Sequence, residues 1–185
     1  FKLTKSKCIV LLFVIFSMFT VLSAFNDKQT PLQHTSAYCF ENLKLFQAAL
    51  DTLQQASIAS AKRETLVKHF LSTRIAFKRI EFIVEYLDNN RYPFFNGVNA
   101  VEMDEGFDPN AQPEGLQVIE SELGEDSLNY TKITLLTNQL KYRTLAFYLI
   151  LKNYKLYDTY IFEAIRFNLI RIETLSLVSF DSPDF

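Results

Sequence analysis

The chain has few of the residues from which metal and redox centres are usually built. Among its 185 residues there are two cysteines, two histidines and no tryptophan. Cys8 lies in an N-terminal apolar run, which leaves Cys39 alone in the rest of the chain. This excludes a Cys-x-x-Cys redox pair, a Cys-x-x-Cys-His site for covalent haem and, once that run is removed, an internal disulfide. His34 and His69 are too few for a histidine-rich zinc or haem site, so we expect no cofactor within this chain.

Basic residues are not in excess either. The formal net charge is −2 at pH 7, with 19 lysine and arginine residues against 21 acidic ones. Proteins that bind nucleic acid or anionic membranes through their charge gather basic residues on one face or in one run. The composition therefore predicts no nucleic-acid partner and no polybasic membrane surface.

The N-terminus has the features of a secretory signal. Three lysines precede an unbroken apolar run, Cys8–Ala24. A basic segment, an apolar segment and a small residue at the cleavage position are typical of a signal peptide. We therefore predict that residues 1–24 are removed, that the mature chain begins near Phe25 and that the protein is periplasmic. Leu22 departs from the usual small residue before the cleavage position, so an uncleaved N-terminal anchor is the alternative. In both cases the membrane is contacted only through this segment.

Glycine and proline are scarce and are confined to one part of the chain. All four glycines and three of the five prolines lie between residues 93 and 124. Helix-breaking residues gathered in this way indicate long helices on both sides of one irregular insertion. We predict an all-α protein in which residues 25–35 are a linker, 36–180 are a helical bundle, and 89–126 are the insertion.

Apolar residues recur every three or four positions in four segments, which is the spacing of one helix face. The segments predict helices over about 36–57, 60–88 and 127–153, and a fourth helix with Asp158 as its N-cap. Four helices of this length with short connections pack as an antiparallel four-helix bundle. In the fourth helix the inward residues are predicted to be Ile161, Ile165, Ile172 and Leu175.

A stripe of charged residues follows the second predicted helix. Arg74, Lys78, Glu81 and Glu85 are spaced by four, three and four positions, so they share one face. Two carboxylates at this spacing, Glu81 and Glu85, are candidate metal ligands of the kind found in di-iron carboxylate bundles. Those sites also use Glu-x-x-His pairs, which this chain lacks. The favoured interpretation is a ladder of ion pairs on a solvated face, in which Lys78 offsets both acids.

The insertion contains one short predicted helix, Glu114–Leu123, with Gly124 as a left-handed C-cap. Its start carries Gly115-x-Gln117-x-x-Glu120. This stretch resembles the Gly-x-His-x-x-Glu signature of imelysin-like proteins, which are exported helical bundles. The resemblance implies that positions 117 and 120 are the metal or functional residues, so Gln117 and Glu120 are the motif's candidate ligands. A glutamine amide binds metals far more weakly than imidazole, and we expect Gln117 to hydrogen-bond inside the bundle instead.

Longer blocks carry a closer resemblance. They are similar to the imelysin-like helical N-terminal region of a Bacteroidetes-type group of dihaem cytochrome-c peroxidases, and they read "FLSTRIAFKRIEFIVEYL", "FFNG", "PEGLQVIESEL" and "FEAIRFNLIRIETLSLVSFDSP". The resemblance implies that this chain is the haem-free module of an exported protein that reduces hydrogen peroxide with electrons from a cytochrome. It also implies c-type haem in a following domain with two Cys-x-x-Cys-His sites, residues 181–185 being the start of that truncated continuation. The partners would be that dihaem domain and an electron-donor cytochrome, and this chain alone would hold no catalytic site.

A second hypothesis is a stand-alone imelysin-like periplasmic protein for iron or haem uptake. Gln117 in place of histidine and the terminal "SFDSP" favour the peroxidase module.

Overall fold

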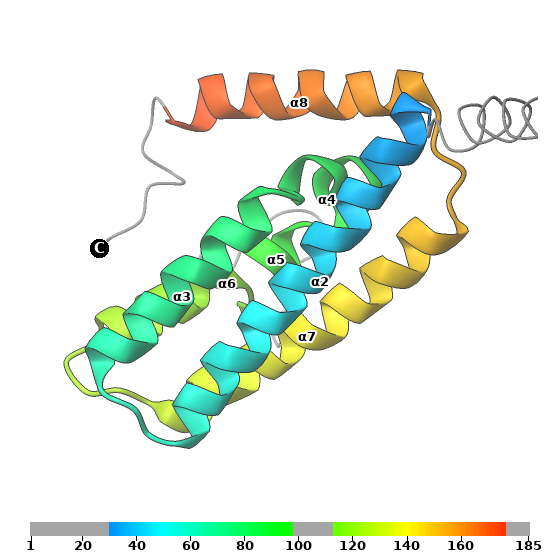
Figure 1. Ribbon diagram of the computed structural model, residues 1–185. Coiled ribbons are helices and arrows are strands. Elements are labelled where there is room, and N and C mark those ends of the chain that lie inside the picture. Colours follow the sequence, from blue (N-terminus) through cyan, green and yellow to red (C-terminus); the bar gives the residue numbers. More distant parts are fainter. Residues whose placement is uncertain (1–29, 98–112, 177–185) are drawn as a thin grey trace, which may run out of the picture. The chain divides into compact units, whose positions relative to one another are not determined.

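The computed structural model describes residues 30–97 and 113–176, and every regular element in them is a helix (Figure 1). The all-α prediction is therefore confirmed for the described residues. The helices are α2 (Pro31–Ile58), α3 (Arg63–Lys78), α4 (Glu81–Leu87), the 3-10 turn η1 (Asn89–Arg91), α5 (Pro93–Asn96), α6 (Leu116–Gly124), α7 (Tyr130–Asn153) and α8 (Asp158–Ser176).

The chain divides after His34, and the packing described below is that of the second unit, Thr35–Phe185. The predicted signal or anchor, 1–24, and the predicted continuation, 181–185, lie outside the described residues. Helix α2 already begins at Pro31, within the stretch expected to be a linker. None of the helices in the described part combines the length and the apolar character that crossing a bilayer requires.

Helices α2 and α7 lie side by side in opposite directions. Ser57, at the end of α2, donates a hydrogen bond to the carbonyl of Tyr130 at the start of α7, with 2.9 Å between the oxygens. At the other end, the rings of Phe40 and Tyr148 meet edge to face, 5.6 Å apart. Neither helix contains a glycine, and their one proline, Pro31, is the first residue of α2, where a proline is tolerated. Asn129 caps α7 by accepting a hydrogen bond from the Lys132 amide at 3.0 Å.

Four buried phenylalanines join the helices into one core. Phe77 of α3 packs against Phe46 of α2 and Phe95 of α5, with ring centroids 5.3 and 5.8 Å apart, and Phe95 meets Phe147 of α7 at 6.4 Å. Each such pair adds about 0.5–1.5 kcal/mol beyond the burial of its area. Because Phe95 belongs to the insertion, this part of the insertion is core.

The prediction of one continuous helix over 60–88 is wrong. Helix α3 ends at Lys78 and α4 begins at Glu81. At the break the Ile80 amide donates to the Phe77 carbonyl, at 2.9 Å, in place of a bond four residues back. There is no glycine or proline at this point. The break turns Glu81 and Glu85 toward α8, so long-range packing overrides the local helical preference.

The predicted left-handed cap at Gly124 is also wrong. Gly124 is the last residue of α6, and among the described residues the glycine with positive φ is Gly115, at 111°. The carbonyls at the end of α6 are instead satisfied by the Arg63 guanidinium, which donates to Leu123 and, at 2.5 and 3.0 Å, to the carbonyls of the two residues that follow the helix. A cationic side chain can replace a glycine cap in this position.

Helix α8 buries a different face from the one that the sequence predicts. Ile161 is buried as expected, but Ile165 and Ile172 are 43 and 50 % exposed, and the side chain of Leu175 is outside the described part. The residues turned toward the other helices are Ile161, Ala164 and Arg171. Helix α8 packs against α4 (Figure 1). Its large exposed residues are Phe162, Ile165, Phe167, Leu169, Ile170 and Ile172.

Candidate functional site

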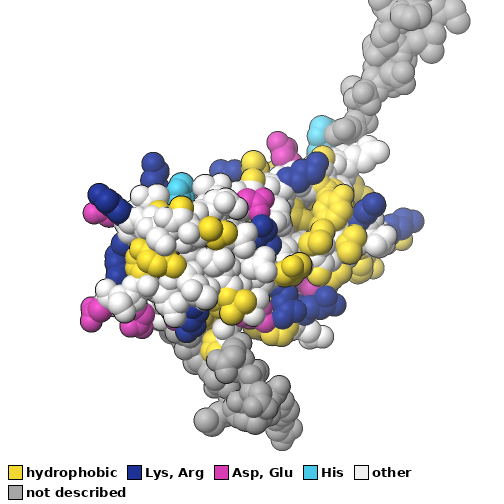
Figure 2. Space-filling model, turned by 90° about the horizontal axis from the view of Figure 1, so that it is seen from below, with side chains coloured by type: hydrophobic (Ala, Val, Ile, Leu, Met, Phe, Trp, Pro, Cys, Tyr) yellow, Lys and Arg dark blue, Asp and Glu magenta, His cyan; other side chains and the backbone are white. Residues whose placement is uncertain are grey.

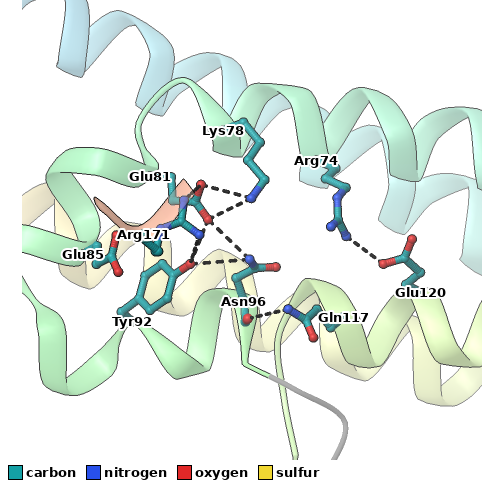
Figure 3. Close-up of polar contacts among 9 residues, drawn as sticks. All are labelled: Arg74, Lys78, Glu81, Glu85, Tyr92, Asn96, Gln117, Glu120 and Arg171. Atoms are coloured by element: carbon teal, nitrogen blue, oxygen red, sulfur yellow. Dashed lines mark hydrogen bonds and ion pairs between the residues drawn. The ribbon is translucent and has the colours of Figure 1, made fainter. Parts of the chain in front are cut away.

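A network of polar side chains occupies the space between α3, α4, α5, α6 and α8 (Figure 3). The predicted stripe on a solvated face is wrong, because Arg74, Glu81 and Glu85 are only 5, 2 and 6 % exposed. Lys78 alone reaches the surface, with a third of its side chain accessible. Arg74 and Lys78 lie on α3, whereas Glu81 and Glu85 lie on α4 beyond the break. The packing of α6 against α3 and of α8 against α4 buries the charged residues.

Glu81 is the centre of the network. Its carboxylate accepts hydrogen bonds from Arg171 at 2.5 Å, from Lys78 at 3.0 and 3.1 Å, from the Tyr92 hydroxyl at 2.8 Å and from Asn96 at 3.3 Å. A carboxylate has about four lone-pair positions, and these donors use them. Glu81 is therefore held as an anion between two cations.

Glu85 lies one turn further along α4 and faces the same guanidinium. Its carboxylate oxygen is 3.0 Å from Arg171 Nε. Burial raises the pKa of Glu85, the Arg171 charge opposes this rise, and the neighbouring Glu81 charge adds to it. Burial, followed by the Glu81 charge, also raises the pKa of Tyr92. Tyr92 thus keeps its proton and acts as a donor.

Gly115 fixes the start of α6 against α5. It forms an isolated antiparallel bridge with Asn96, and its φ of 111° is a backbone conformation that residues with a side chain rarely adopt. A Cβ atom at this position would lie 3.0 Å from the Phe95 carbonyl group. The glycine of the motif is therefore required by backbone conformation and close approach.

The two other motif residues point to different partners. Gln117 donates through Nε2 to the Asn96 carbonyl at 3.1 Å, so it hydrogen-bonds inside the protein as expected. The Glu120 carboxylate pairs with Arg74 Nη1 at 2.7 Å, and both side chains are buried. The motif therefore ties α6 to α5 and α3.

The structure does not bring the candidate ligands together around a common point. Glu81 and Glu85 both face Arg171, while Glu120 faces Arg74. Within residues 30–97 and 113–176, no three His, Cys, Asp or Glu side chains converge to hold a metal ion. Three cations instead face three carboxylates, so the charges of the network balance internally.

The described residues also do not fit a haem centre. Burial raises the pKa of the Cys39 thiol to about 11, so it remains a protonated thiol. Neither His34 nor His69 belongs to the network, and the sequence has no Cys-x-x-Cys-His. The arrangement can bind helices to one another through charge, but the described part supplies no ligand set for haem iron.

Three members of the network were not identified from the sequence, namely Arg171, Tyr92 and Asn96. Tyr92 and Asn96 are four positions apart in a short segment between breakers, where no periodic pattern could be read. Arg171 carried a usable signal. It shares helical spacing with Ile161 and Ala164, and an arginine on a buried face needs a carboxylate partner, whereas the predicted inner face included Ile165 and Ile172 instead.

Known proteins offered no further guide to the site. Comparisons with protein-family models, with curated proteins and with solved structures found no match to this chain.

Proposed function

We propose that this chain is a non-catalytic helical module of an exported protein, and that the outer face of α8 docks a further protein domain. The supporting observation is that α8 buries an arginine and exposes most of its large apolar side chains. Phe162 and Leu169 are 72 and 61 % exposed, and four more apolar residues of α8 are at least 43 % exposed. Exposed apolar surface of this extent is typical of an interaction site.

The buried network supports the same proposal because it holds α8 in one orientation. Arg171 contacts Glu81, Glu85 and Tyr92, which come from α4 and the segment after it. A guanidinium with several partners fixes both the rotation and the position of its helix. A docking face held in place before binding loses less conformational entropy when its partner arrives.

The resemblance to dihaem cytochrome-c peroxidases supplies the identity of the docked domain in this proposal. The parent protein would be periplasmic and would reduce hydrogen peroxide with electrons from a donor cytochrome. Its c-type haem would be carried by the C-terminal domain, since the described residues do not fit a haem centre. The same proposal includes the architecture of the chain: α2, α3, α7 and α8 would be the long helices of an imelysin-like antiparallel four-helix bundle.

The first experiment reads the genomic DNA beyond the codon for Phe185. A frame that continues for a domain's length with two Cys-x-x-Cys-His motifs is the expected result. The complete protein, matured in a host that attaches c-type haem, should oxidise a reduced cytochrome when hydrogen peroxide is added. A stop codon with no haem-binding sequence would favour the uptake protein instead.

The second experiment tests the docking face of α8. The haem domain and this chain are expressed separately, and the affinity between them is measured by calorimetry. Phe162→Ser with Leu169→Ser should weaken binding about 30-fold or more, because a buried anchor contributes about 2 kcal/mol or more. Ile75→Ser is the matched control, since Ile75 is 59 % exposed on α3. Equal losses in both variants would argue against α8 as the docking face.

A further inference from the structure

A groove lies between α2 and α7, away from the polar network. Its volume is about 430 Å³, and it is lined by Leu43, Lys44, Gln47, Asn138, Lys141, Tyr142, Thr144, Leu145 and Tyr148. Figure 2 views the molecule from below, the side along which α7 runs in Figure 1, and shows hydrophobic side chains gathered beside lysine and arginine side chains.

The lining of the groove is apolar where it is deepest. Leu43 and Thr144 are each 2 % exposed, and the Thr144 hydroxyl is satisfied by the Leu140 carbonyl at 2.7 Å. Tyr148 is held by its edge contact with Phe40. Leu145 stands at the rim, with 57 % of its surface accessible. Such a surface suits an alkyl chain, because covering it removes apolar area from water.

The two lysines of the groove differ in their surroundings. Lys141 Nζ is engaged by Asp51 at 2.6 Å and by Gln54 at 2.8 Å. Lys44 is exposed, and no carboxylate of the described residues lies within ion-pair distance of it. Lys44 precedes Asp51 by seven residues, so it is about 10 Å further along α2. One end of the groove therefore carries a neutralised lysine and the other end a lysine whose charge is available.

We propose that this groove binds an amphipathic monoanion, such as a medium-chain carboxylate. The carboxylate lies at Lys44, and the alkyl chain lies against Leu43, Leu145 and Tyr148. Charge complementarity at Lys44 selects an anion, and the apolar lining selects a chain over a small polar ion. The volume is that of a small-molecule site, which favours an amphiphile over a protein helix as the occupant.

The absence of tryptophan makes a direct test possible. Tyr142 lines the groove and is 67 % exposed, so Tyr142→Trp places the only tryptophan there without disturbing the core. Decanoate, kept below its micellar concentration, is titrated into the full chain. A saturable shift of emission to shorter wavelength is expected. Leu145→Asp in the same background should abolish this shift, and its circular dichroism spectrum should be unchanged because the residue is at the rim.

The role of Lys44 is tested by removing its charge and by comparing a charged ligand with a neutral one. In the reporter background, Lys44→Gln should weaken decanoate binding about two- to fivefold, the range of an exposed ion pair. The same substitution should leave binding of decanol, the neutral analogue, unchanged. Equal effects on decanoate and decanol, or no response of the reporter to decanoate, would overturn the proposal.

A second tryptophan reporter distinguishes decanoate binding in the groove from binding to the apolar face of α8. Phe162→Trp places the only tryptophan on α8, and decanoate should leave its emission unchanged over the range that saturates the groove reporter. The same concentration dependence at both positions would mean non-specific adsorption to apolar surface and would reject the groove. Displacement of decanoate by an acidic amphipathic peptide at lower concentration would reject the amphiphile in favour of a protein partner.

Discussion

At the scale of single residues, the buried charges are the main feature of this protein. Removing charges from water is costly, and the cost is recovered only when each charge has well-placed partners. Arg171 has two carboxylates and a phenol, and Glu81 has two cations, a phenol and an amide. Loss of one member leaves the others desolvated, so stability depends on the network as a whole.

The Arg74–Glu120 pair gives a direct measure of this dependence. Glu120→Ala should lower the free energy of unfolding by about 3–5 kcal/mol, because it removes one partner of a buried ion pair. Urea denaturation with an unchanged m-value measures the loss. The control is Glu163→Ala, which breaks the exposed pair with Arg166 and should cost less than about 1 kcal/mol. Similar costs in the two variants would show that the Arg74–Glu120 pair contributes no more than a surface pair.

Glu85 should make stability depend on pH. Its pKa in the folded protein is raised above the ordinary value of 4.5, so the folded state binds the proton more tightly than the unfolded state. The stabilisation from the protonated form is complete below pH 4.5 and is lost as the pH rises through the raised pKa. The natural protein should therefore lose stability relative to Glu85→Gln over this rise. Denaturation midpoints of both proteins measured from pH 4 to about 7 provide the test, and a constant difference between them would contradict it.

The sequence indicated the members of the charged stripe but not their environment. Arg74, Lys78, Glu81 and Glu85 would have the same spacing on a solvated helix face and on a buried one. The outcome depends on Arg171 and Glu120, which come from distant parts of the chain. Local periodicity contains no information about such partners, and for this reason it favours the solvated interpretation, which is wrong.

At the scale of elements, Gly115 and Gly124 allow a matched comparison within one helix. Gly115→Ala should destabilise the protein by about 1–3 kcal/mol, because its φ of 111° and the contact with Phe95 disfavour any Cβ atom. Gly124→Ala should be neutral or stabilising by up to about 1 kcal/mol, since a Cβ atom there meets nothing within 4 Å and alanine favours a helix. Thermal unfolding followed by circular dichroism distinguishes the two. Destabilisation by Gly124→Ala alone would contradict this account of α6.

Periodicity predicted the extent of α2 and α7 well, because each buries residues at helical spacing and has no internal glycine or proline. It failed for α8, where apolar residues surround most of the helix. Ile165 and Ile172 fit the inward pattern as well as Ile161 does, yet only Ile161 is buried. The rotation of α8 is set by the buried partners of Arg171. The break between α3 and α4 was missed for a related reason, since no local breaker marks it.

At the scale of the whole molecule, the prediction of export can be tested independently of function. The mature protein should begin near Phe25, because the lysine-flanked apolar run is typical of a cleaved signal. N-terminal sequencing of material recovered from the periplasm of a Gram-negative host identifies the first residue. Retention of residues 1–24 in a membrane-associated product would support the uncleaved anchor instead.

The attachment of α8 through Arg171 also has a consequence for the order of folding. Arg171 and Glu81 are 90 residues apart in the chain. Contacts between distant residues form only after the entropy of closing the intervening loop has been overcome, so α8 is expected to join after α2, α3 and α7 have packed. A helix that joins late and keeps its apolar side bare is the part of a newly made chain most open to self-association. Timely arrival of a partner would then protect this protein from aggregation as well as complete its assembly.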